Sequence, residues 1–414
     1  MVVRYFLVLG WLATTLKLKI CQRAPKSVFR QPHLRTSSIP GSEYDALSQE
    51  MWDRFMKSQQ TEETFRKKMS LWRYLYITIK SIFPRYGLYV VGSTMTGFGL
   101  DSSDMDLCLF VRPLDNLDPR SHALLHLNYI LGYIKTLDPG AELIQAKVPI
   151  LKFREVRNGL QVDLNCNNIV GVKNTDLLTC FLDWRVRPLV VVTKLWAQAH
   201  NINDARQRTL SSYSLTLMVI HFLQCEYTFS FILLLGGRSP YPAILPRAVD
   251  MCWEPRRPHN RTSLAELFIN MLHYYAEFPY SRMAVSVRLG ARLPIPECRA
   301  ARALKNDPHQ WKLLCVEEPF DLTNTARSVY DPDTFERIVA AFRGAATRLT
   351  AALTFIIILY TNYTPRLGPH GVASRTRARE RDGGCLSSRS RARARLVASR
   401  SHIQMFIYSP EIYL

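Results

Sequence analysis

Two aspartates separated by one residue stand inside an otherwise apolar segment. The stretch VGSTMTGFGLDSSDMDLCLF, residues 91–110, contains Gly92 and Ser93 and then Asp104 and Asp106. Aspartate is among the poorest residues for a strand interior, and strand side chains alternate, so both carboxylates are expected on one face. At about 4 Å apart they would repel by roughly 4 kcal/mol at an effective dielectric near 20. A divalent cation would offset that cost, because hard cations prefer oxygen ligands.

A third carboxylate and the glycine-serine pair extend this candidate site. Asp163 stands in LQVDLN, on a later apolar strand, and three aspartates from neighbouring strands can hold two metal ions. Gly92 lets backbone N–H groups approach a phosphate closely, and Ser93 can donate as well. Each signal is weak by itself, because acidic pairs are usually solvated and Asp163 alone fits a strand end that faces solvent. Together they favour a site for metal ions and phosphates.

The elements that must position these residues begin with two helices. Apolar residues recur at spacings of three and four from Asp45 to Lys80, and Pro84 ends the second helix. Strands are predicted in GLYVVGS and SDMDLCLFVRP, a helix in SHALLHLNYILGYIKTL, and strands in LIQAKVPILKFREV and LQVDLNCNNIVGV, with a turn at Asn158-Gly159. Further helices are predicted in RVRPLVVVTKLWAQAH, SSYSLTLMVIHFLQ, SLAELFINMLHYYAEF and DPDTFERIVAAFRGAATRL. The fold class is therefore α+β, a mixed sheet flanked by helices and followed by a mostly α-helical domain.

Five segments follow from these patterns. They are an N-terminal extension (1–41), leading helices (42–83), the α/β domain (84–176), the helical domain (177–350) and a basic low-complexity tail (351–414). The extension holds an apolar run that resembles a signal-peptide core but is too short to span a bilayer comfortably, and we expect it outside the folded domain. An apolar insertion near 225–239 predicts a disordered or poorly packed excursion. The tail reads as a disordered basic arm or as sequence foreign to the fold.

Composition limits the classes of partner and compartment. The net charge is +20, from 54 basic and 34 acidic residues, which favours a polyanionic partner such as nucleic acid or an anionic membrane surface. Much of this excess lies in the arginine-rich tail, so the body is only moderately basic. The nine cysteines are odd in number and form no CxxC pair, and several, such as Cys108, Cys166, Cys180 and Cys315, stand in apolar runs. This pattern argues against a zinc or disulfide framework and favours a reducing compartment.

At this point the motifs resemble a known family. A Gly-Ser pair, a DxD pair and a third Asp on a later strand resemble the DNA polymerase β-like nucleotidyltransferase superfamily. VGSTMTGFGLDSSDMDLCLF, AKVPILKFR, DLNCNNIVGVKNT, RVRPLVVVTKLWA, LSSYSLTLMVIHFLQ and VEEPFDLTNTARSV resemble one subgroup, the cytoplasmic poly(A) polymerases of the germ-line-development (GLD-two) type. The resemblance covers residues 42–350 apart from the insertion. It implies a nucleotidyltransferase domain over 84–176 and a PAP-associated domain over 177–350.

The resemblance also implies a role for each motif residue. The catalytic and metal-binding residues would be Asp104, Asp106 and Asp163. The residues that hold or neutralise the triphosphate would be Gly92, Ser93, Lys194 and Ser212. The residues that contact the base or sugar would be Tyr213, which stacks on the base, Asn168, which contacts the sugar, and Glu318 and Asp321, which line the base pocket. Elementary chemistry agrees, because a transferring phosphate needs cations and a base needs an aromatic face.

Alternatives remain for single residues. Taken alone, Lys194 reads as a surface lysine, Tyr213 as a core residue and Glu317 with Glu318 as a solvated turn; the order of the motifs favours the functional roles. Related uridylyl transferases often carry a His within the segment that matches PFDLTNTAR, and its absence here favours ATP as the donor. Gln198 stands where wider relatives often carry a second basic residue.

The expected activity is template-independent polyadenylation of RNA 3′ ends with ATP and two Mg²⁺ or Mn²⁺ ions, in the cytoplasm. The alternatives are a terminal uridylyltransferase, a catalytically dead RNA-binding scaffold and, from the N-terminal apolar run alone, a membrane-anchored protein; no membrane association is expected. No RRM or zinc-knuckle signature is present, so RNA selection falls to basic surface or to a recruiting RNA-binding protein, which the resemblance favours. The candidate surface residues are Lys147, Lys152, Arg154 and Arg157.

Overall fold

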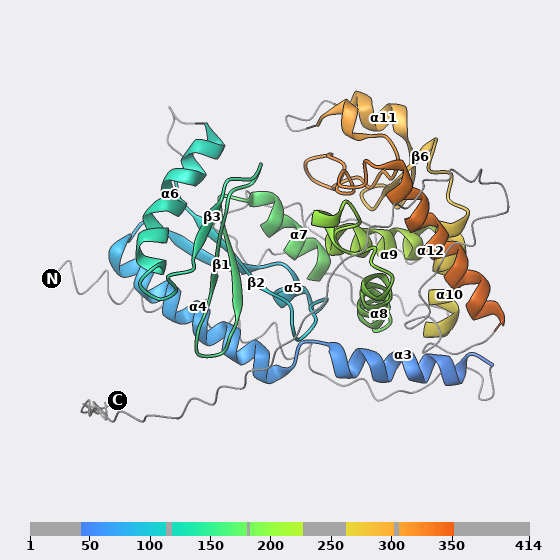
Figure 1. Ribbon diagram of the computed structural model, residues 1–414, viewed down its shortest axis with the longest axis horizontal. Helices are drawn as coiled ribbons and strands as arrows, with labels where there is room; N and C mark the ends of the chain where they lie inside the picture. Colours follow the sequence, from blue (N-terminus) through green and yellow to red (C-terminus); the bar gives the residue numbers. More distant parts are fainter. Residues whose placement is uncertain (1–42, 113–117, 180–182, 227–261, 302–305, 352–414) are drawn as a thin grey trace, which may run out of the picture. The chain divides into compact units, whose positions relative to one another are not determined.

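The computed structural model describes residues 43–112, 118–179, 183–226, 262–301 and 306–351 (Figure 1). The expected N-terminal extension, almost all of the insertion near 225–239, Cys180 and the tail beyond residue 351 lie outside these ranges. No helix within the described ranges combines the length and the hydropathy needed to cross a bilayer.

Two helices lead the described chain, as predicted. They are α3 (Asp45–Ser58) and α4 (Glu62–Ile82). Thr61 caps α4 with its side chain, which suits a residue type preferred at that position. Apolar side chains spaced four apart in α4 are buried, so this helix presents one apolar stripe to the sheet. These side chains are Leu71, Leu75 and Ile79.

A five-stranded mixed sheet follows. Its strands are β1 (Gly87–Val91), β2 (Met105–Phe110), β3 (Glu142–Ile144), β4 (Ile150–Arg154) and β5 (Gln161–Cys166). The spatial order is β1-β2-β5-β4-β3. Only β2 and β5 run parallel among these neighbours; the other pairs are antiparallel. A mixed sheet with helices packed on it confirms the predicted α+β class.

Two predicted strands have different boundaries in the structure. The segment LIQAKVPILKFREV contains two strands, β3 and β4, which pair with each other antiparallel. The strand predicted to continue to about residue 172 ends at Cys166, and α7 (Ile169–Thr179) begins shortly after it. The cause is Asn167, which adopts a φ of 52° and hydrogen-bonds both backbone groups of Val111 through its side-chain amide. This local geometry turns the chain away from the sheet.

Side-chain alternation gives the sheet two different faces. Met105, Leu107 and Leu109 turn to a core shared with α4 and α6 (Pro119–Ile134). The other face packs against α5 (Ser93–Thr96) and α7, and Figure 1 shows these two pairs of helices on opposite sides of the sheet. Asp106 lies between Met105 and Leu107 and therefore faces α5 and α7.

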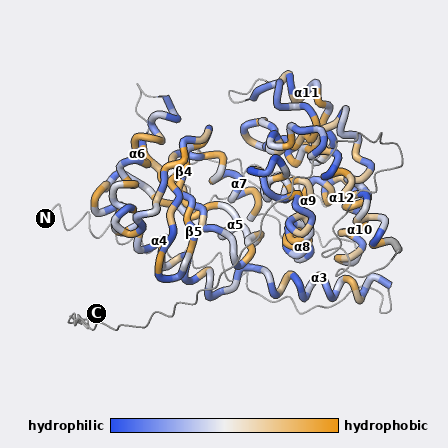
Figure 2. Tube along the Cα trace, viewed as in Figure 1, coloured by the Kyte–Doolittle hydropathy of each residue, from blue (hydrophilic) through white to orange (hydrophobic). Residues whose placement is uncertain are grey.

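The four predicted helices of the second part are all present. They are α8 (Val186–Ala199), α9 (Ser212–Glu226), α10 (Leu264–Ala276) and α12 (Pro332–Ala351). Trp196, Phe268 and Phe342 are fully buried between them. Figure 2 shows hydrophobic residues gathered on α8 and α10.

A small hairpin and a short helix in this part were not predicted. They are β6 (Met283–Ser286), β7 (Ala291–Pro294) and α11 (Ile295–Ala300), with 3-10 turns at Ala205–Gln207 and Pro308–Gln310. Strands of four residues are too short to show a period of two, and β7 also contains an arginine and a proline. The second part is therefore mostly, but not wholly, helical.

Helix α3 packs with the second part although it precedes the sheet in the chain. Leu47, Met51 and Phe55 are buried in the same core as α8 and α10. The hydroxyl of Ser48 also accepts a hydrogen bond from the backbone N–H of Ala265, at the start of α10. The helical core is therefore built from residues that precede the sheet in the sequence as well as from residues that follow it.

Candidate active site

Two aspartates and a lysine form a row across three adjacent strands. Asp106 on β2 is paired in register with Asp163 on β5, which is paired in register with Lys152 on β4. All three alternate with buried apolar residues and so share the face toward α5 and α7. The ammonium Nζ of Lys152 lies 3.0 Å from Asp163 Oδ1 and 3.2 Å from Asp104 Oδ2. The three predicted aspartates therefore converge on one place.

Gly92 brings the Gly-Ser turn against this row. Its φ is 72°, a conformation that residues with a side chain rarely adopt. A Cβ atom at this position would lie only 2.3 Å from Asp106 Oδ2, so no larger residue fits without displacement. The backbone N–H of Gly92 donates to Thr175 Oγ1 at 2.9 Å, and Ser93 begins α5. The structure thus places the predicted phosphate-binding pair beside the predicted metal-binding carboxylates.

The electrostatics of the row reflect crowded negative charge. Burial, together with the charges of Asp163 and Asp104, raises the pKa of Asp106 to about 7. Burial acts to lower the pKa of Lys152, but its hydrogen bonds and charge interactions with Asp163 and Asp104 outweigh that effect and raise it. Lys152 therefore stays protonated and supplies positive charge that the carboxylates share.

A second lysine, on α4, anchors the segment that leads into the aspartate row. Lys68 on α4 is completely buried, and its ammonium donates to Gln60 Oε1 at 2.9 Å and to the carbonyl of Ser103 at 2.8 Å. It also lies 3.5 Å from Thr94 Oγ1. Burial lowers its pKa, while the nearby aspartates, Asp106 foremost, act in the opposite direction. Lys68 thus ties α4 to α5 and to the residue that precedes Asp104.

The donor chemistry of the row fits a divalent cation. Among the described residues, no group of three or more His, Cys, Asp or Glu side chains is arranged as it stands to hold a metal ion. Three carboxylates nevertheless converge here, and their repulsion contributes to the raised pKa of Asp106. The ammonium of Lys152 already brings one positive charge between Asp104 and Asp163. Hard divalent cations prefer such oxygen donors, so the three aspartates suit them in charge and in type.

Lys194 reaches the same region from α8. It is buried, not a surface residue, and its Nζ donates to the carbonyl of Phe98 at 2.8 Å. Burial lowers the pKa of Lys194 to about 8, and the charge of Asp106 opposes this shift. Within the described residues, the ammonium of Lys194 has this one hydrogen bond, to a backbone carbonyl beside the Gly-Ser turn, and is well placed to receive an anion. Gln198, one turn further along α8, is exposed.

A second group of predicted residues gathers at the start of α9. Ser211 caps this helix, since its hydroxyl accepts from the backbone N–H of Ser214 at 3.0 Å. Ser212 is exposed and donates to Asn203 Oδ1 at 3.2 Å. The hydroxyl of Tyr213 donates to Glu318 Oε1 at 3.2 Å, and burial raises the pKa of this tyrosine well above its ordinary value. Tyr213 and Glu318 are therefore direct neighbours although 105 residues separate them.

Residues 318–323 form a tight loop that we call the 318–323 loop. The carboxylate of Glu318 accepts hydrogen bonds from the backbone N–H groups of Phe320 and Asp321, and Asp321 Oδ1 accepts from the N–H and hydroxyl of Thr323. Burial raises the pKa of Glu318, and these backbone hydrogen bonds oppose the shift. Glu317 and Glu318 are both buried, so the segment is not a solvated turn.

Helix α7 joins the two groups through three consecutive residues. Lys173 lies over the ring of Phe320 at 5.6 Å from its centroid, and hydrogen bonding by Asn174 acts to lower the pKa of Glu318. Thr175 binds the backbone of Gly92. The aspartate row and the 318–323 loop are therefore linked through one helix. Asn168, predicted to contact a sugar, stands at the start of α7 and accepts from the N–H of Gly171 at 3.3 Å.

Sequence reasoning predicted Lys194 but missed the roles of two other lysines in this site, Lys152 and Lys68. Lys152 was expected on an RNA-facing basic surface, but its ammonium instead pairs with Asp163 and Asp104. Its position in the alternation of AKVPILKFR was a usable signal, yet the register that sets it opposite Asp163 is a tertiary property. Lys68 gave no signal at all, because a lysine in an amphipathic helix is ordinarily exposed. Among the described residues, the side-chain hydrogen bonds of Asn168 and Ser212 go to Gly171 and Asn203 and not to the three aspartates.

Comparison with known proteins agrees with this geometry. Residues 47–183 match the family model for the central palm domain of mitochondrial-like poly(A) RNA polymerase, and residues 263–324 match that of the Cid1 family poly A polymerase. The chain is 46% identical over 320 residues to Poly(A) RNA polymerase gld-2 homolog A of Drosophila melanogaster, covering 74% of this chain and 23% of that protein. A solved GLD-2/RNP-8 complex matches with a TM-score of 0.66 and 39% identity, covering 78% of this chain and 99% of that one. The chain belongs to the GLD-2 family of poly(A) RNA polymerases.

The GLD-2 relationship extends over both parts of the structure. A second solved complex, GLD-2 with GLD-3, matches with a TM-score of 0.59 and 39% identity over 77% of this chain and 98% of that one. The aspartate row lies within the first matched family domain and the 318–323 loop within the second. The chain spans about a quarter of the length of the fly GLD-2 relatives that it matches.

Proposed function

We propose that the chain is a template-independent poly(A) polymerase that adds AMP from ATP to the 3′ end of RNA. The observation that carries this proposal is the in-register pairing of Asp106 with Asp163 directly against the Gly92 turn. In the reaction, the 3′-hydroxyl of RNA attacks the α-phosphate of ATP, a new phosphodiester bond forms, and the bond to pyrophosphate breaks. The curated fly and worm relatives named poly(A) RNA polymerases support the choice of reaction.

The carboxylates of Asp104, Asp106 and Asp163 would hold two divalent cations, and Mg²⁺ or Mn²⁺ suits their oxygen donors. When bound, such ions promote ionisation of the attacking hydroxyl and neutralise the leaving pyrophosphate. Gly92 supports binding by leaving room for a phosphate close to the backbone, and Ser93 can donate a hydrogen bond there. Lys194 adds positive charge for the triphosphate from the other side.

The nucleoside would bind between α9 and the 318–323 loop. Tyr213 offers an aromatic face for the base, while Glu318 and Asp321 offer carboxylates to its polar edge. We assign the sugar contact to Asn168 and a phosphate contact to Ser212, which is exposed at the first turn of α9. Helix α7 supports this arrangement because it contacts both the loop and Gly92.

ATP is the proposed donor, and a uridylyl transferase is the alternative. The 318–323 loop contains no histidine, and Thr323 is followed directly by Asn324. The test is extension of a labelled RNA primer by the purified chain with each nucleotide in turn. We expect the longest products with ATP; faster extension with UTP would reject the assignment.

The rival from another class is an RNA-binding scaffold without catalysis. The same primer assay with Asp106→Ala decides between them, because the scaffold predicts no difference from the unmodified chain. A matched control is Asp118→Ala, which removes a helix-capping aspartate of α6 remote from the row. We expect Asp106→Ala to abolish extension and Asp118→Ala to retain it.

RNA selection is proposed to depend on a recruiting protein and on exposed basic residues. The two solved GLD-2 structures are complexes with RNP-8 and with GLD-3, which supports a protein partner for this chain. Lys147, Arg154 and Arg157 are exposed on the sheet side. Joint replacement of Arg154 and Arg157 by Ser is expected to raise the KM for RNA and leave that for ATP unchanged. We further propose that the chain acts in the cytoplasm, which imaging of the tagged protein would test.

A further inference from the structure

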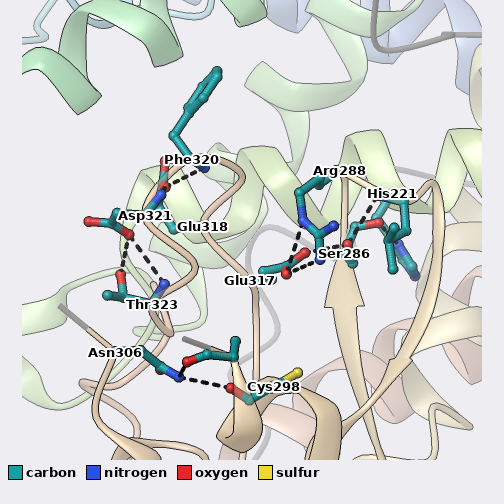
Figure 3. Close-up of polar contacts among 12 residues, drawn as sticks. His221, Ser286, Arg288, Cys298, Asn306, Glu317, Glu318, Phe320, Asp321 and Thr323 are labelled. Carbon is teal, nitrogen blue, oxygen red and sulfur yellow. Dashed lines mark hydrogen bonds and ion pairs between the residues drawn. The ribbon is translucent and has the colours of Figure 1, made fainter. Parts of the chain in front are cut away.

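A buried acidic residue stands immediately before the 318–323 loop and serves none of the roles assigned above. Glu317 is only 3% exposed, and Ser286 on β6 is fully buried beside it. Its carboxylate accepts hydrogen bonds from the Ser286 hydroxyl and from Arg288, whose terminal nitrogen lies 2.6 Å away. Figure 3 shows the Glu317 side chain turned toward Ser286 and Arg288, with Glu318 on the other side of the chain. This cluster is therefore separate from the contacts of Glu318.

Backbone hydrogen bonds fix Glu317 at the base of the 318–323 loop. Its N–H donates to the carbonyl of Val285 at 2.8 Å, which adds this segment to β6. Glu317 also bridges to Asn324, and the N–H of Glu318 donates to the carbonyl of Thr323 at 2.8 Å. The loop is thus closed at its base by residues on either side of it. A displacement of Glu317 would be carried directly to Glu318 through one peptide unit.

Helix α9 contacts the 318–323 loop and its supporting residues at two places along its length. Near its start, Tyr213 donates to Glu318. Two turns later, the ring of His221 hydrogen-bonds the carbonyl of Ser286 through Nδ1 at 3.2 Å, and Ser286 in turn holds Glu317. Two fixed points define the position of the loop along the helix better than one, because a single contact permits rotation.

We infer that Glu317, held by Ser286 and Arg288, is a positioning residue for base recognition. It fixes the position of the Glu318 carboxylate relative to the Tyr213 side chain, and so determines which nucleobase the loop accepts. The inference rests on the proposed function, because it assigns Tyr213 and Glu318 to the base. Glu317 itself touches neither Tyr213 nor the aspartate row in the structure and acts through its neighbour.

The physical reason is the cost of releasing a buried charge. A carboxylate that is 3% exposed needs its hydrogen-bond donors, and without Arg288 it must move toward water or take up a proton. Movement toward water would displace the peptide that joins Glu317 to Glu318. The triphosphate contacts of Gly92 and Lys194 lie on other elements and should not move. The cluster therefore predicts a loss confined to the base end of the nucleotide.

The experiment compares ATP with inorganic tripolyphosphate, which carries the phosphates but no base. Binding of both to the full chain is measured by calorimetry for Arg288→Met, Ser286→Ala and Glu317→Gln. We expect ATP to bind about tenfold more weakly, the scale of one misplaced polar contact, while tripolyphosphate binding stays within about twofold. In the primer assay the KM for ATP should rise with kcat nearly unchanged, and the ATP to UTP ratio should fall. Equal losses for ATP and tripolyphosphate would overturn the inference.

Two further variants separate positioning from general damage. Arg288→Lys keeps the charge at a partly exposed position, so it should fold and recover much of the ATP affinity. Arg185→Gln removes another buried ion pair, with Asp183, and the hydrogen bond from Arg185 to the carbonyl of Thr262, which lies just before α10. It should lower stability without changing the ATP to UTP ratio, and an equal change in that ratio would refute the inference. If the unmodified chain bound ATP no better than tripolyphosphate and extended no primer, the proposed function itself would fail.

Discussion

Lys152 on β4 lies directly opposite Asp163 on β5, and its ammonium is shared between Asp163 and Asp104. The lysine is one-third exposed, so its contribution is screened by water. In EDTA, Lys152→Met should lower the free energy of unfolding by about 1 kcal/mol, because the carboxylates lose their shared cation. Added Mn²⁺ should then raise the Tm more in the variant than in the unmodified chain.

The measurement for Lys152 is thermal unfolding with and without Mn²⁺. Lys147→Met is the matched control, since this lysine is exposed and the structure gives it no ion pair among the described residues. It should change neither the Tm nor its response to the ion. Equal Mn²⁺ responses in the Lys152 variant and the unmodified chain would contradict the shared-charge explanation.

Gly92→Ala should abolish primer extension and destabilise the fold. The added methyl would meet Asp106 Oδ2 at 2.3 Å, and the φ of 72° would be strained in any L-residue other than glycine. Gly132→Ala is the control, because a Cβ there meets nothing within 4 Å and the residue lies inside α6. It should stabilise by up to about 1 kcal/mol, the usual helix preference for alanine. Urea unfolding of both variants, with the primer assay, provides the comparison.

Lys68→Met should destabilise the chain by about 2 to 4 kcal/mol, because Gln60 and the carbonyl of Ser103 lose a buried donor. Extension should slow as well, since Lys68 holds the segment that precedes Asp104. Lys67→Met changes the adjacent lysine, which forms an exposed pair with Glu63, and should change the stability very little. Urea unfolding of the two variants in parallel measures this difference. Similar losses of unfolding free energy would show that the buried hydrogen bonds of Lys68 do not stabilise the chain.

Stability should fall in mild acid because of His221. Burial lowers the pKa of His221 from 6.5 to about 4; the hydrogen bond that its ring donates to the carbonyl of Ser286 opposes this shift, and the charge of Arg292 adds to it. The other groups that face the ring are Cys225 and Tyr274. The unfolded chain binds this proton more readily, so the contribution is complete above about pH 6.5 and is lost as the pH falls toward 4. It amounts to about 3 kcal/mol.

The His221 prediction is checked by urea unfolding between pH 7 and pH 4.5. His221→Asn removes the titrating group while keeping a polar side chain, and should flatten the slope over this range even if it lowers stability at pH 7. An unchanged slope would assign the acid sensitivity to other groups, such as paired carboxylates.

The site residues that could be predicted from the sequence are those that stand out within a short local pattern. Asp104 directly precedes the apolar strand β2, and Asp106 and Asp163 interrupt β2 and β5, so the contrast is visible in the sequence itself. The lysines were hidden, because whether Lys152 faces Asp163 depends on strand register and whether Lys68 is buried depends on how α4 lies on the sheet. Both are properties of packing between segments far apart in the chain.

The same distinction explains the fold. Long periodic helices such as α4 and α8 were predicted close to their observed limits. The hairpin of β6 and β7 was missed because four residues carry too little pattern. The first four residues of α7 were read as strand because they follow β5 and are mostly apolar. The hairpin matters, since it supplies Ser286 and so the support beneath Glu317.

Helix α3 emerges from the ribosome long before α8 and α10, the helices against which it packs. The strands of the sheet are all synthesised in the interval and can pair, while Leu47, Met51 and Phe55 still lack their core. An amphipathic helix in that condition is a target for chaperones that bind exposed apolar surface. The order of synthesis therefore leaves α3, the first of the described helices, without its packing partners until α8 and α10 have been made.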